Sequence, residues 1–308
     1  MHCDRRTAIG LLASTFFPPK SLRAATGAET RLVLLGTAGG PRIKKNRSSS
    51  AQAVVAGGNI YIVDCGYGVA RQMVLAGLRL PQLKEVFITH HHSDHDIDLG
   101  PLLQLAWLSG LTTPVGCWGP PSMERMLRDY MRYEAYDIAV RTQDEGRAPF
   151  GRLVRAHEVR GGGPVMQDGN VRVTAARVHH PPVNLALAYR FDAPDRSIVI
   201  SGDTRPSAEL VRLAHGADVL VHEAMLPQYV GELVSTLPGQ QRLARSVLSH
   251  HTTAEQAGQV AADAGVKMLV LSHLVPAGDP DIPDAVWIDA ARRHYSGPIV
   301  VGRDLMEI

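Results

Sequence analysis

Cysteine is scarce in this 308-residue sequence: only Cys3, Cys65 and Cys117 occur, without a CxxC pair. So few and so widely spaced thiols exclude a disulfide-stapled scaffold. Aromatic residues make up 5% of the chain, which disfavours binding of single-stranded nucleic acid by stacking. No apolar run reaches the roughly 18–20 residues of a membrane span. The net charge of +2 gives little overall attraction to a polyanion, whereas 45% hydrophobic residues suffice for a full core.

The first 28 residues are predicted to be a targeting signal. Arg5 and Arg6 precede a short apolar stretch over 8–17 and a small-residue segment over 24–28. This order is typical of a cleavable export signal, and the paired arginines resemble a twin-arginine signal. We therefore expect an exported, periplasmic protein whose folded domain covers 29–308. The alternative is an unprocessed extension of a cytoplasmic enzyme.

The remaining chain shows no internal repeat or linker that would divide it, so we expect a single α/β domain. Two strand-rich stretches are each followed by alternating helices and strands, which favours sheets covered by helices on their outer faces. Cys65 and Cys117 are predicted to be small buried hydrophobic residues rather than a disulfide. Thr252 and Glu255 have capping-box spacing before a predicted helix over 254–264. Other helices are predicted over 69–76, 99–108, 122–133, 207–214 and 284–294, and strands over 31–35, 52–56, 59–64, 85–89, 171–178, 186–191, 197–201, 219–222, 268–272 and 299–301.

A histidine cluster directly follows the predicted strand over 85–89. His90, His92, Asp94 and His95 form the pattern HxHxDH. Alternate residues of an extended loop project to the same side, so His90 and His92 can bind one ion while Asp94 and His95 turn toward a second. Imidazole and carboxylate without thiolate suit Zn²⁺ in an open, catalytic site.

Further candidate ligands stand at the ends of other predicted strands. They are the His179-His180 pair before two prolines, Asp203 in a Gly-Asp-Thr sequence, and His273. Each residue alone is a weak signal, because a single strand-end histidine is more often structural. Together with HxHxDH they indicate a site for two metal ions.

These motifs resemble those of the metallo-β-lactamase superfamily. The segments 35–40 and 47–49, the sequence HEA at 222–224 and the sequence HTTA at 251–254 are similar to the tRNase Z and arylsulfatase-like branch. The resemblance covers nearly the whole chain after residue 28. It implies an αββα sandwich with two Zn²⁺ ions between the sheet edges, although Mn²⁺ or Fe²⁺ are alternatives. It also implies the ligand sets His90, His92 and His180 for one ion and Asp94, His95 and His273 for the other, with Asp203 bridging both. His179 is the alternative to His180.

The resemblance further implies a hydrolase that uses a metal-bridging hydroxide. His251, oriented by Glu223, would protonate the leaving group, and Asp94 would help to position the water. The competing interpretation is that Glu223 and His251 only join two loops. His222 has an orienting or a structural role, and the basic loop Arg42–Arg47 either steers an anionic substrate or is merely solvated.

The substrate is expected to be a small anionic ester, either a phosphodiester or an aryl sulfate. tRNA 3′ processing is an alternative, but only 22 residues separate His180 from Asp203, which leaves no room for that family's tRNA-binding arm. Nucleic acid is therefore disfavoured as a partner. Asp203 weighs against a β-lactam, whereas lactone hydrolysis remains open. A sulfur dioxygenase and a non-catalytic metal-binding module are minor alternatives.

No sequence signal supports a homo-oligomer. The segment 106–163 is expected to shape the pocket. Within it, Trp107, Trp118 and Tyr133 either line the pocket or pack in the core.

Overall fold

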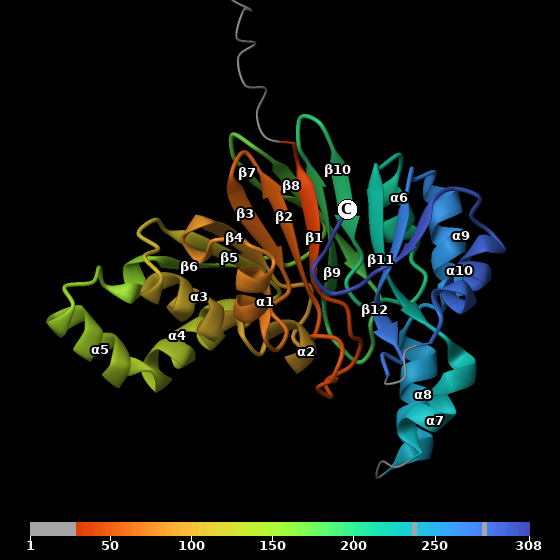
Figure 1. The fold of residues 1–308 in the computed structure, drawn as a ribbon, viewed down its shortest axis with the longest axis horizontal. Coiled ribbons are helices and arrows are strands. Elements are labelled where there is room, and N and C mark those ends of the chain that lie inside the picture. The colour runs from red at the N-terminus through yellow and green to blue at the C-terminus, as the bar shows by residue number, and fades with distance from the viewer. Residues whose placement is uncertain (1–28, 236–238, 279–281) are drawn as a thin grey trace, which may run out of the picture.

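The computed structural model of the chain describes residues 29–235, 239–278 and 282–308. In this part of the chain, two seven-stranded sheets lie face to face between two layers of helices (Figure 1). The predicted export signal over 1–28 lies outside the described residues. None of the described helices is long and apolar enough to cross a membrane.

The first sheet has the strand order β14-β1-β2-β3-β4-β5-β6. Its N-terminal strands pair antiparallel, whereas β3 to β6 run parallel. The strands are β1 (Arg31–Gly36), β2 (Ala51–Ala56), β3 (Asn59–Val63), β4 (Leu83–Phe87), β5 (Val115–Gly119), β6 (Val154–Glu158) and β14 (Met306–Glu307).

The second sheet has the order β13-β12-β11-β10-β9-β8-β7. Here β10 to β13 are parallel and β7 to β9 form an antiparallel meander that continues into β10. Its strands are β7 (Gly163–Gln167), β8 (Arg172–Val178), β9 (Ala186–Asp192), β10 (Ser197–Ile200), β11 (Val219–Met225), β12 (Leu269–Val275) and β13 (Ile299–Val301).

Side-chain alternation along the strands creates three apolar layers. In β1, Leu32 and Leu34 face the other sheet, whereas Val33 and Leu35 face the outer helices. The central layer joins the sheets through aromatic contacts, with Phe87 of β4 packed 5.2 Å from Phe191 of β9, between ring centroids. Because both faces of each sheet are covered, the central strands are apolar on both sides.

Helices cover the outer face of each sheet. The first sheet is covered by α1 (Val69–Leu75), α3 (Leu99–Leu108) and α4 (Met123–Tyr133), with α5 (Ala135–Asp144) extending beyond its edge (Figure 1). The second is covered by α6 (Ala208–Ala214), α9 (Ala254–Ala264) and α10 (Asp284–Arg292). A helical hairpin of α7 (Val230–Val234) and α8 (Gln240–His250) projects from one end of the molecule. The short elements are α2 (Ser93–Asp96) and the 3₁₀ turns Leu80–Gln82, Phe150–Arg152 and Pro227–Tyr229.

The predicted αββα sandwich is confirmed, and most predicted elements occur within a few residues of their expected bounds. The helices over 99–108 and 254–264 have the predicted limits. The capping box is shifted by one residue, because Thr253 and Gln256 form it rather than Thr252 and Glu255. Cys65 and Cys117 are buried free thiols, as predicted. The sequence analysis missed β5, β6, β7, β14 and the helices α5, α7 and α8.

Candidate metal centre and active site

The candidate site lies where several strands end at the same edge of the two sheets. The HxHxDH segment follows β4, His180 follows β8, and Asp203 follows β10. His273 stands within β12, next to β11, which carries Glu223. Loops beyond strand ends are the usual location of ligand sites in layered α/β folds. The fold therefore brings together residues that are up to 183 positions apart, from His90 to His273.

Local backbone geometry aims the side chains inward. His92 is extended and caps α2, so Asp94 and His95 leave the first helical turn in a different direction from His90. Gly202, directly before Asp203, has φ of 58°, and an added Cβ would lie 2.8 Å from Thr89. His273 also has a positive φ, 43°. Glycine adopts this conformation without strain, whereas a positive φ at a residue such as His273 costs about 1–3 kcal/mol and is typical of functional sites.

One set of ring nitrogens surrounds the Oδ2 atom of Asp203. His92 Nδ1 lies 3.0 Å from His90 Nε2 and 3.3 Å from His180 Nε2. Asp203 Oδ2 lies 3.9 Å from His90 Nε2 and 3.8 Å from His180 Nε2. These four atoms come from the loops that follow β4, β8 and β10, and they face one another.

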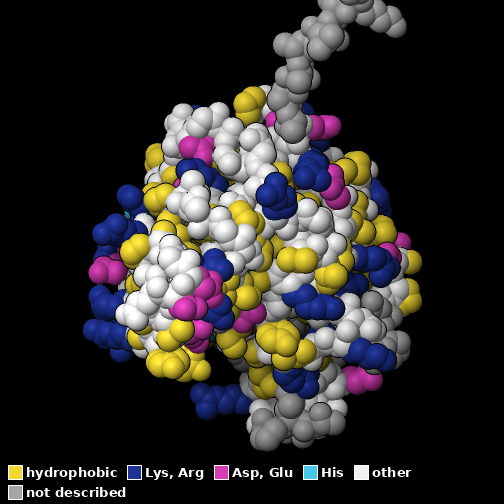
Figure 2. All heavy atoms as spheres, turned by 60° about the vertical axis from the view of Figure 1, so that its left-hand side comes forward, with side chains coloured by type: hydrophobic (Ala, Val, Ile, Leu, Met, Phe, Trp, Pro, Cys, Tyr) yellow, Lys and Arg dark blue, Asp and Glu magenta, His cyan; other side chains and the backbone are white. Residues whose placement is uncertain are grey.

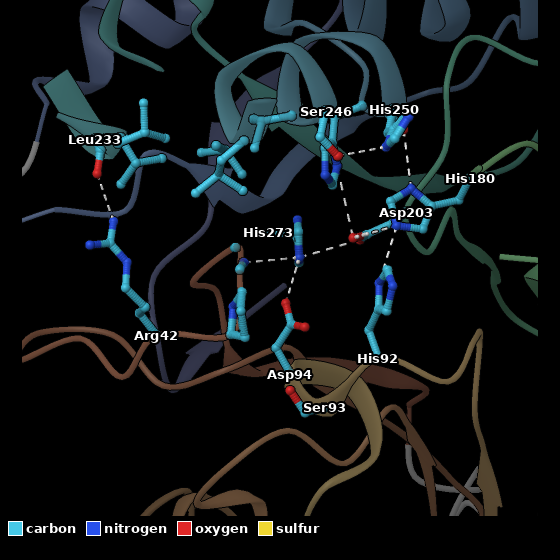
Figure 3. A pocket seen from close by; sticks show the side chains of 18 of the residues that line it. Arg42, His92, Ser93, Asp94, His180, Asp203, Leu233, Ser246, His250 and His273 are labelled. Atoms are coloured by element: carbon cyan, nitrogen blue, oxygen red, sulfur yellow. Dashed lines mark hydrogen bonds and ion pairs between the residues drawn. The ribbon is translucent and has the colours of Figure 1, made fainter. Parts of the chain in front are cut away.

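A second set surrounds the other oxygen of the same carboxylate. Asp203 Oδ1 lies 3.4 Å from His95 Nε2 and 3.3 Å from His273 Nε2. Asp94 Oδ2 lies 3.4 Å from His273 Nε2 (Figure 3). The same oxygen lies 3.7 Å from His95 Nε2. Each oxygen of Asp203 thus belongs to a different set, as expected for a residue that bridges two ions.

The donor atoms fit divalent metal ions. Ligands about 2.0–2.1 Å from a tetrahedral Zn²⁺ lie about 3.3 Å from each other, which is close to the observed separations. His95 Nε2 and Asp203 Oδ1 are buried and have no hydrogen-bond partner among the described residues. Buried polar atoms are rarely left unsatisfied. Metal ligation would satisfy both, so the seven predicted ligand residues together fit the predicted ions.

Electrostatics within the cluster keep its carboxylates ionised. Burial favours the neutral acid, but His95 and His273 lower the pKa of Asp94 to about 2. The pKa of Asp203 is also lowered, because His273, His95 and His90 outweigh its burial. Burial lowers the pKa of His90, of His92 and of His180, the last to about 4. Burial disfavours the charged ring of His95 as well, but Asp203, Asp64 and Asp94 outweigh it and raise the pKa of this histidine. Ionised carboxylates and neutral imidazoles are the forms that bind metals, so an ion would replace a proton at His95.

Asp64 supports the cluster from behind. Its Oδ2 atom lies 2.7 Å from Nδ1 of His95, and its Oδ1 atom accepts a hydrogen bond from the Thr89 amide. A carboxylate behind a ligating histidine fixes the ring orientation and the nitrogen that faces the metal. The sequence analysis missed this role. Asp64 directly follows the apolar strand β3, and a carboxylate at the end of such a strand indicates a functional site.

Glu223 and His251 form a hydrogen-bonded pair beside the ligands. His251 Nδ1 lies 2.7 Å from Glu223 Oε2, and the Thr204 amide donates to the other oxygen of Glu223. Burial disfavours the charged ring, yet Glu223 and Asp203 raise the pKa of His251 to about 9. The ring is therefore protonated at neutral pH and lines the pocket, where it can donate a proton.

The neighbouring histidines lie outside the ligand sets. His91 turns away and contacts Asp96 and the carbonyl of Pro120. His179 is 55% exposed and lies near Glu209, so the structure brings His180 rather than His179 into the cluster. His222 is buried and bonds to the Glu223 carbonyl, which places it in the core.

A cavity of about 350 Å³ opens above the cluster (Figure 3). One wall comes from the α7–α8 hairpin, which contributes Leu233, Val234, Leu243, Val247 and other side chains. The expectation that 106–163 shapes this pocket is wrong. Trp107 packs on Phe150, Trp118 stacks on His157, and Tyr133 is 82% exposed. The sequence analysis did not predict this hairpin, although Leu243, Ala244, Val247 and Leu248 recur at helical spacing in α8.

The basic loop Arg42–Arg47 faces the pocket in part. Arg42 and Lys44 line it, and Arg42 donates to the Leu233 carbonyl across the cavity (Figure 3). Arg47 is instead buried against Thr37 and the Gly302 carbonyl. Among the described lining residues, the acids are Asp94 and Asp203, so the rim itself is cationic.

Sequence and structure comparisons agree with this geometry. Residues 59–274 match the family described as "Beta-lactamase superfamily domain". The chain belongs to the metallo-β-lactamase superfamily. "Ribonuclease Z" of Mycobacterium avium (strain 104) is 35% identical over 282 residues, which cover 90% of this chain and 97% of that protein.

Solved structures of the superfamily share the fold at lower identity. The short form of human tRNase Z superposes with a TM-score of 0.65 at 21% identity, covering 90% of this chain and 98% of that one. Zn²⁺-bound PqqB from Methylobacterium extorquens superposes with a TM-score of 0.67 at 14% identity, covering 90% and 99%. The family match over residues 59–274 confirms the predicted superfamily, and the solved structures share its predicted fold.

The prediction of a small-molecule ester with nucleic acid disfavoured is contradicted. Relatives that match this chain over almost their entire length are named for ribonuclease activity. The error came from treating a long inserted arm as necessary, whereas the match leaves no room for such an arm in the relative either. The names of these relatives give no support to an aryl sulfate substrate.

The surface on the side of the first sheet and its covering helices carries both positive and negative charges. Lys and Arg side chains stand beside Asp and Glu, with small scattered apolar groups between them (Figure 2). On α4, for example, Arg128 pairs with Glu124 and Arg132 with Asp129. This balance contrasts with the cationic rim of the pocket.

Proposed function

We propose that this chain is a two-metal-ion phosphodiesterase that hydrolyses RNA. The observation that carries the proposal is the division of the Asp203 carboxylate between two ligand sets, one oxygen to each. Paired ions that share a carboxylate are a recurrent arrangement in enzymes that cleave phosphate esters. The ribonuclease names of the similar proteins support RNA as the substrate class.

Zn²⁺ is the ion that the ligands favour, since they offer imidazole and carboxylate but no thiolate. Mn²⁺ and Fe²⁺ are the alternatives. When bound, the ions lower the pKa of water toward neutrality and polarise a phosphoryl oxygen. His90, His92 and His180 would hold one ion, and Asp94, His95 and His273 would hold the other, with Asp203 shared between them.

The protein's own side chains supply substrate binding and a proton. Arg42 and Lys44 at the rim attract the phosphodiester. His251, protonated and held by Glu223, donates its Nε2 proton to the leaving oxygen as the P–O bond breaks. Glu223 is a positioning residue, because its carboxylate fixes the ring that faces the pocket.

A comparison of matched small substrates tests the hydrolase class. The zinc-loaded chain should cleave bis(p-nitrophenyl) phosphate and leave p-nitrophenyl sulfate at the rate of buffer, because the site is built for a phosphodiester. Both reactions release the same nitrophenolate, so leaving-group chemistry is controlled. A faster rate on the sulfate would contradict the proposal.

A further inference from the structure

Helix α8 presents two adjacent faces. Leu243, Val247 and His250 follow one another at helical spacing and line the catalytic pocket. Arg242, Arg245 and Ser249 lie on the next face and line a second groove, together with Pro181 and Pro182. The helix thus forms a ridge between the metal centre and this groove.

The groove and the catalytic pocket adjoin each other. Pro182, Ser246 and His250 line both. The two spaces meet beside a metal-ligand candidate, because His180 Nδ1 lies 3.1 Å from the carbonyl oxygen of His250. Ser246 Oγ lies 3.1 Å from His250 Nδ1 and closes the same turn of the helix (Figure 3). A chain molecule bound at the metal centre can therefore extend into the groove.

The groove carries positive charge that no acidic residue among the described lining residues neutralises. Arg242 and Arg245 are exposed, and neither forms an ion pair with the described residues. They stand three residues apart on one helix face, where like charges repel. No acidic residue lines the groove in the described part of the chain. Guanidinium groups in this arrangement are suited to phosphate oxygens.

We propose that Arg242 and Arg245 form a second phosphate subsite, which binds the backbone of a nucleic-acid strand next to the phosphodiester at the metal centre. This inference rests on the proposed function and adds that the substrate is a strand with several phosphates. The subsite raises affinity for the strand and does not touch the reacting atoms. Diesters with a single phosphate do not reach it.

Charge reversal tests the subsite. The variant Arg242→Glu/Arg245→Glu is compared with Arg71→Glu/Arg79→Glu, which reverses two exposed arginines outside the pocket that also lack an ion pair among the described residues. The readouts are binding of a fluorescein-labelled oligoribonucleotide of about 12 nucleotides by the full chain, and kcat and KM on bis(p-nitrophenyl) phosphate. Binding is measured after chelation of the metal, so that no cleavage interferes.

The α8 variant should bind the oligonucleotide at least tenfold more weakly at about 50 mM salt. The slope of log affinity against log salt should become shallower by about 0.7 for each phosphate that the variant no longer neutralises. Kinetics on bis(p-nitrophenyl) phosphate should be unchanged. The conservative variant Arg242→Lys/Arg245→Lys should retain most of the affinity and the salt slope. The control pair should bind like the wild type.

The subsite is refuted if the α8 variant binds the oligonucleotide like the wild type, or if the control pair loses as much affinity. It is also refuted if small-diester turnover falls together with binding, since that indicates a disturbed site. A wild type that binds the strand through these arginines but cleaves no diester would overturn the proposed function and leave the subsite standing.

Discussion

His251 Nδ1 lies 2.7 Å from Glu223 Oε2, although the two residues come from different elements, the end of α8 and the middle of β11. Glu223 is fully buried, and its second oxygen accepts from the Thr204 amide. The carboxylate therefore cannot rotate freely, and it fixes the protonated Nδ1 of the imidazole. The remaining nitrogen of His251 is available to the pocket that its ring lines.

This relationship predicts a leaving-group effect. His251→Ala should slow diesters with alkoxide leaving groups by about 10²–10⁴-fold, the usual contribution of a general acid. Nitrophenolate departs without protonation, so bis(p-nitrophenyl) phosphate should be slowed far less. Initial rates over a series of diesters with graded leaving-group pKa measure the effect. Equal losses across the series would reduce His251 to a loop-joining role.

The ligand assignment predicts opposite results for neighbouring histidines. His92→Ala should lose bound metal and at least about a hundredfold in rate, since even residues behind metal ligands contribute 10–100-fold. His91→Ala is the matched control, because His91 contacts Asp96 and Pro120 rather than the cluster. Metal content by mass spectrometry and diester rates provide both readouts. Full activity of the His92 variant would refute the ligand sets.

Asp64 is predicted to act through His95. Asp64→Asn keeps the shape of the side chain but weakens the 2.7 Å interaction that orients the imidazole. Metal affinity, measured by competition with a chromogenic chelator, should fall by about 10–100-fold. Asp96→Asn, which alters the partner of His91 outside the cluster, should bind metal like the wild type. Similar losses in both variants would indicate a general effect of carboxylate removal.

Metal binding should stabilise the folded chain. The buried donor atoms of His95 and Asp203 gain partners only when an ion is bound. Ligand at 100 times its Kd adds about 2.7 kcal/mol to the free energy of unfolding. Thermal unfolding should therefore show a higher Tm with Zn²⁺ than with chelator, and a much smaller difference for His92→Ala. An unchanged Tm in the wild type would contradict the fit of the site to metal.

The predicted signal over 1–28 has a separate test. Deleting these residues should leave hydrolysis intact, since among the described residues the first that lines the pocket is Gly39. The deletion should also prevent export of the chain in a bacterial fractionation experiment. Unchanged distribution between the fractions would refute the export signal and would favour the cytoplasmic alternative.

The sequence alone was sufficient to locate the candidate ligands, because HxHxDH and the later residues all stand next to apolar runs that form strands. The same reasoning predicted the helix over 254–264, whose apolar stripe packs on the second sheet. These apolar patterns can be recognised within a short stretch of sequence. A strand that is buried on both faces gives an especially clear pattern, because nearly all of its residues are apolar.

The pocket wall could not be predicted in this way. Helix α8 carries Leu243, Ala244, Val247 and Leu248 at helical spacing, so a helix could have been predicted there, but not the surface on which it packs. Its position depends on contacts with α7 and on the link between His250 and His180, which are far apart in the sequence. Asp64 was missed for a related reason, since its partner His95 is distant along the chain.

The most direct test of the central claim is cleavage of a 5′-labelled structured RNA that carries a 3′ extension. The zinc-loaded chain is compared with the chelated chain and with His92→Ala. The account predicts discrete cleavage products that appear only with the loaded wild type and carry defined ends on sequencing gels. Absence of cleavage by the loaded chain, or equal cleavage by all three samples, would contradict it.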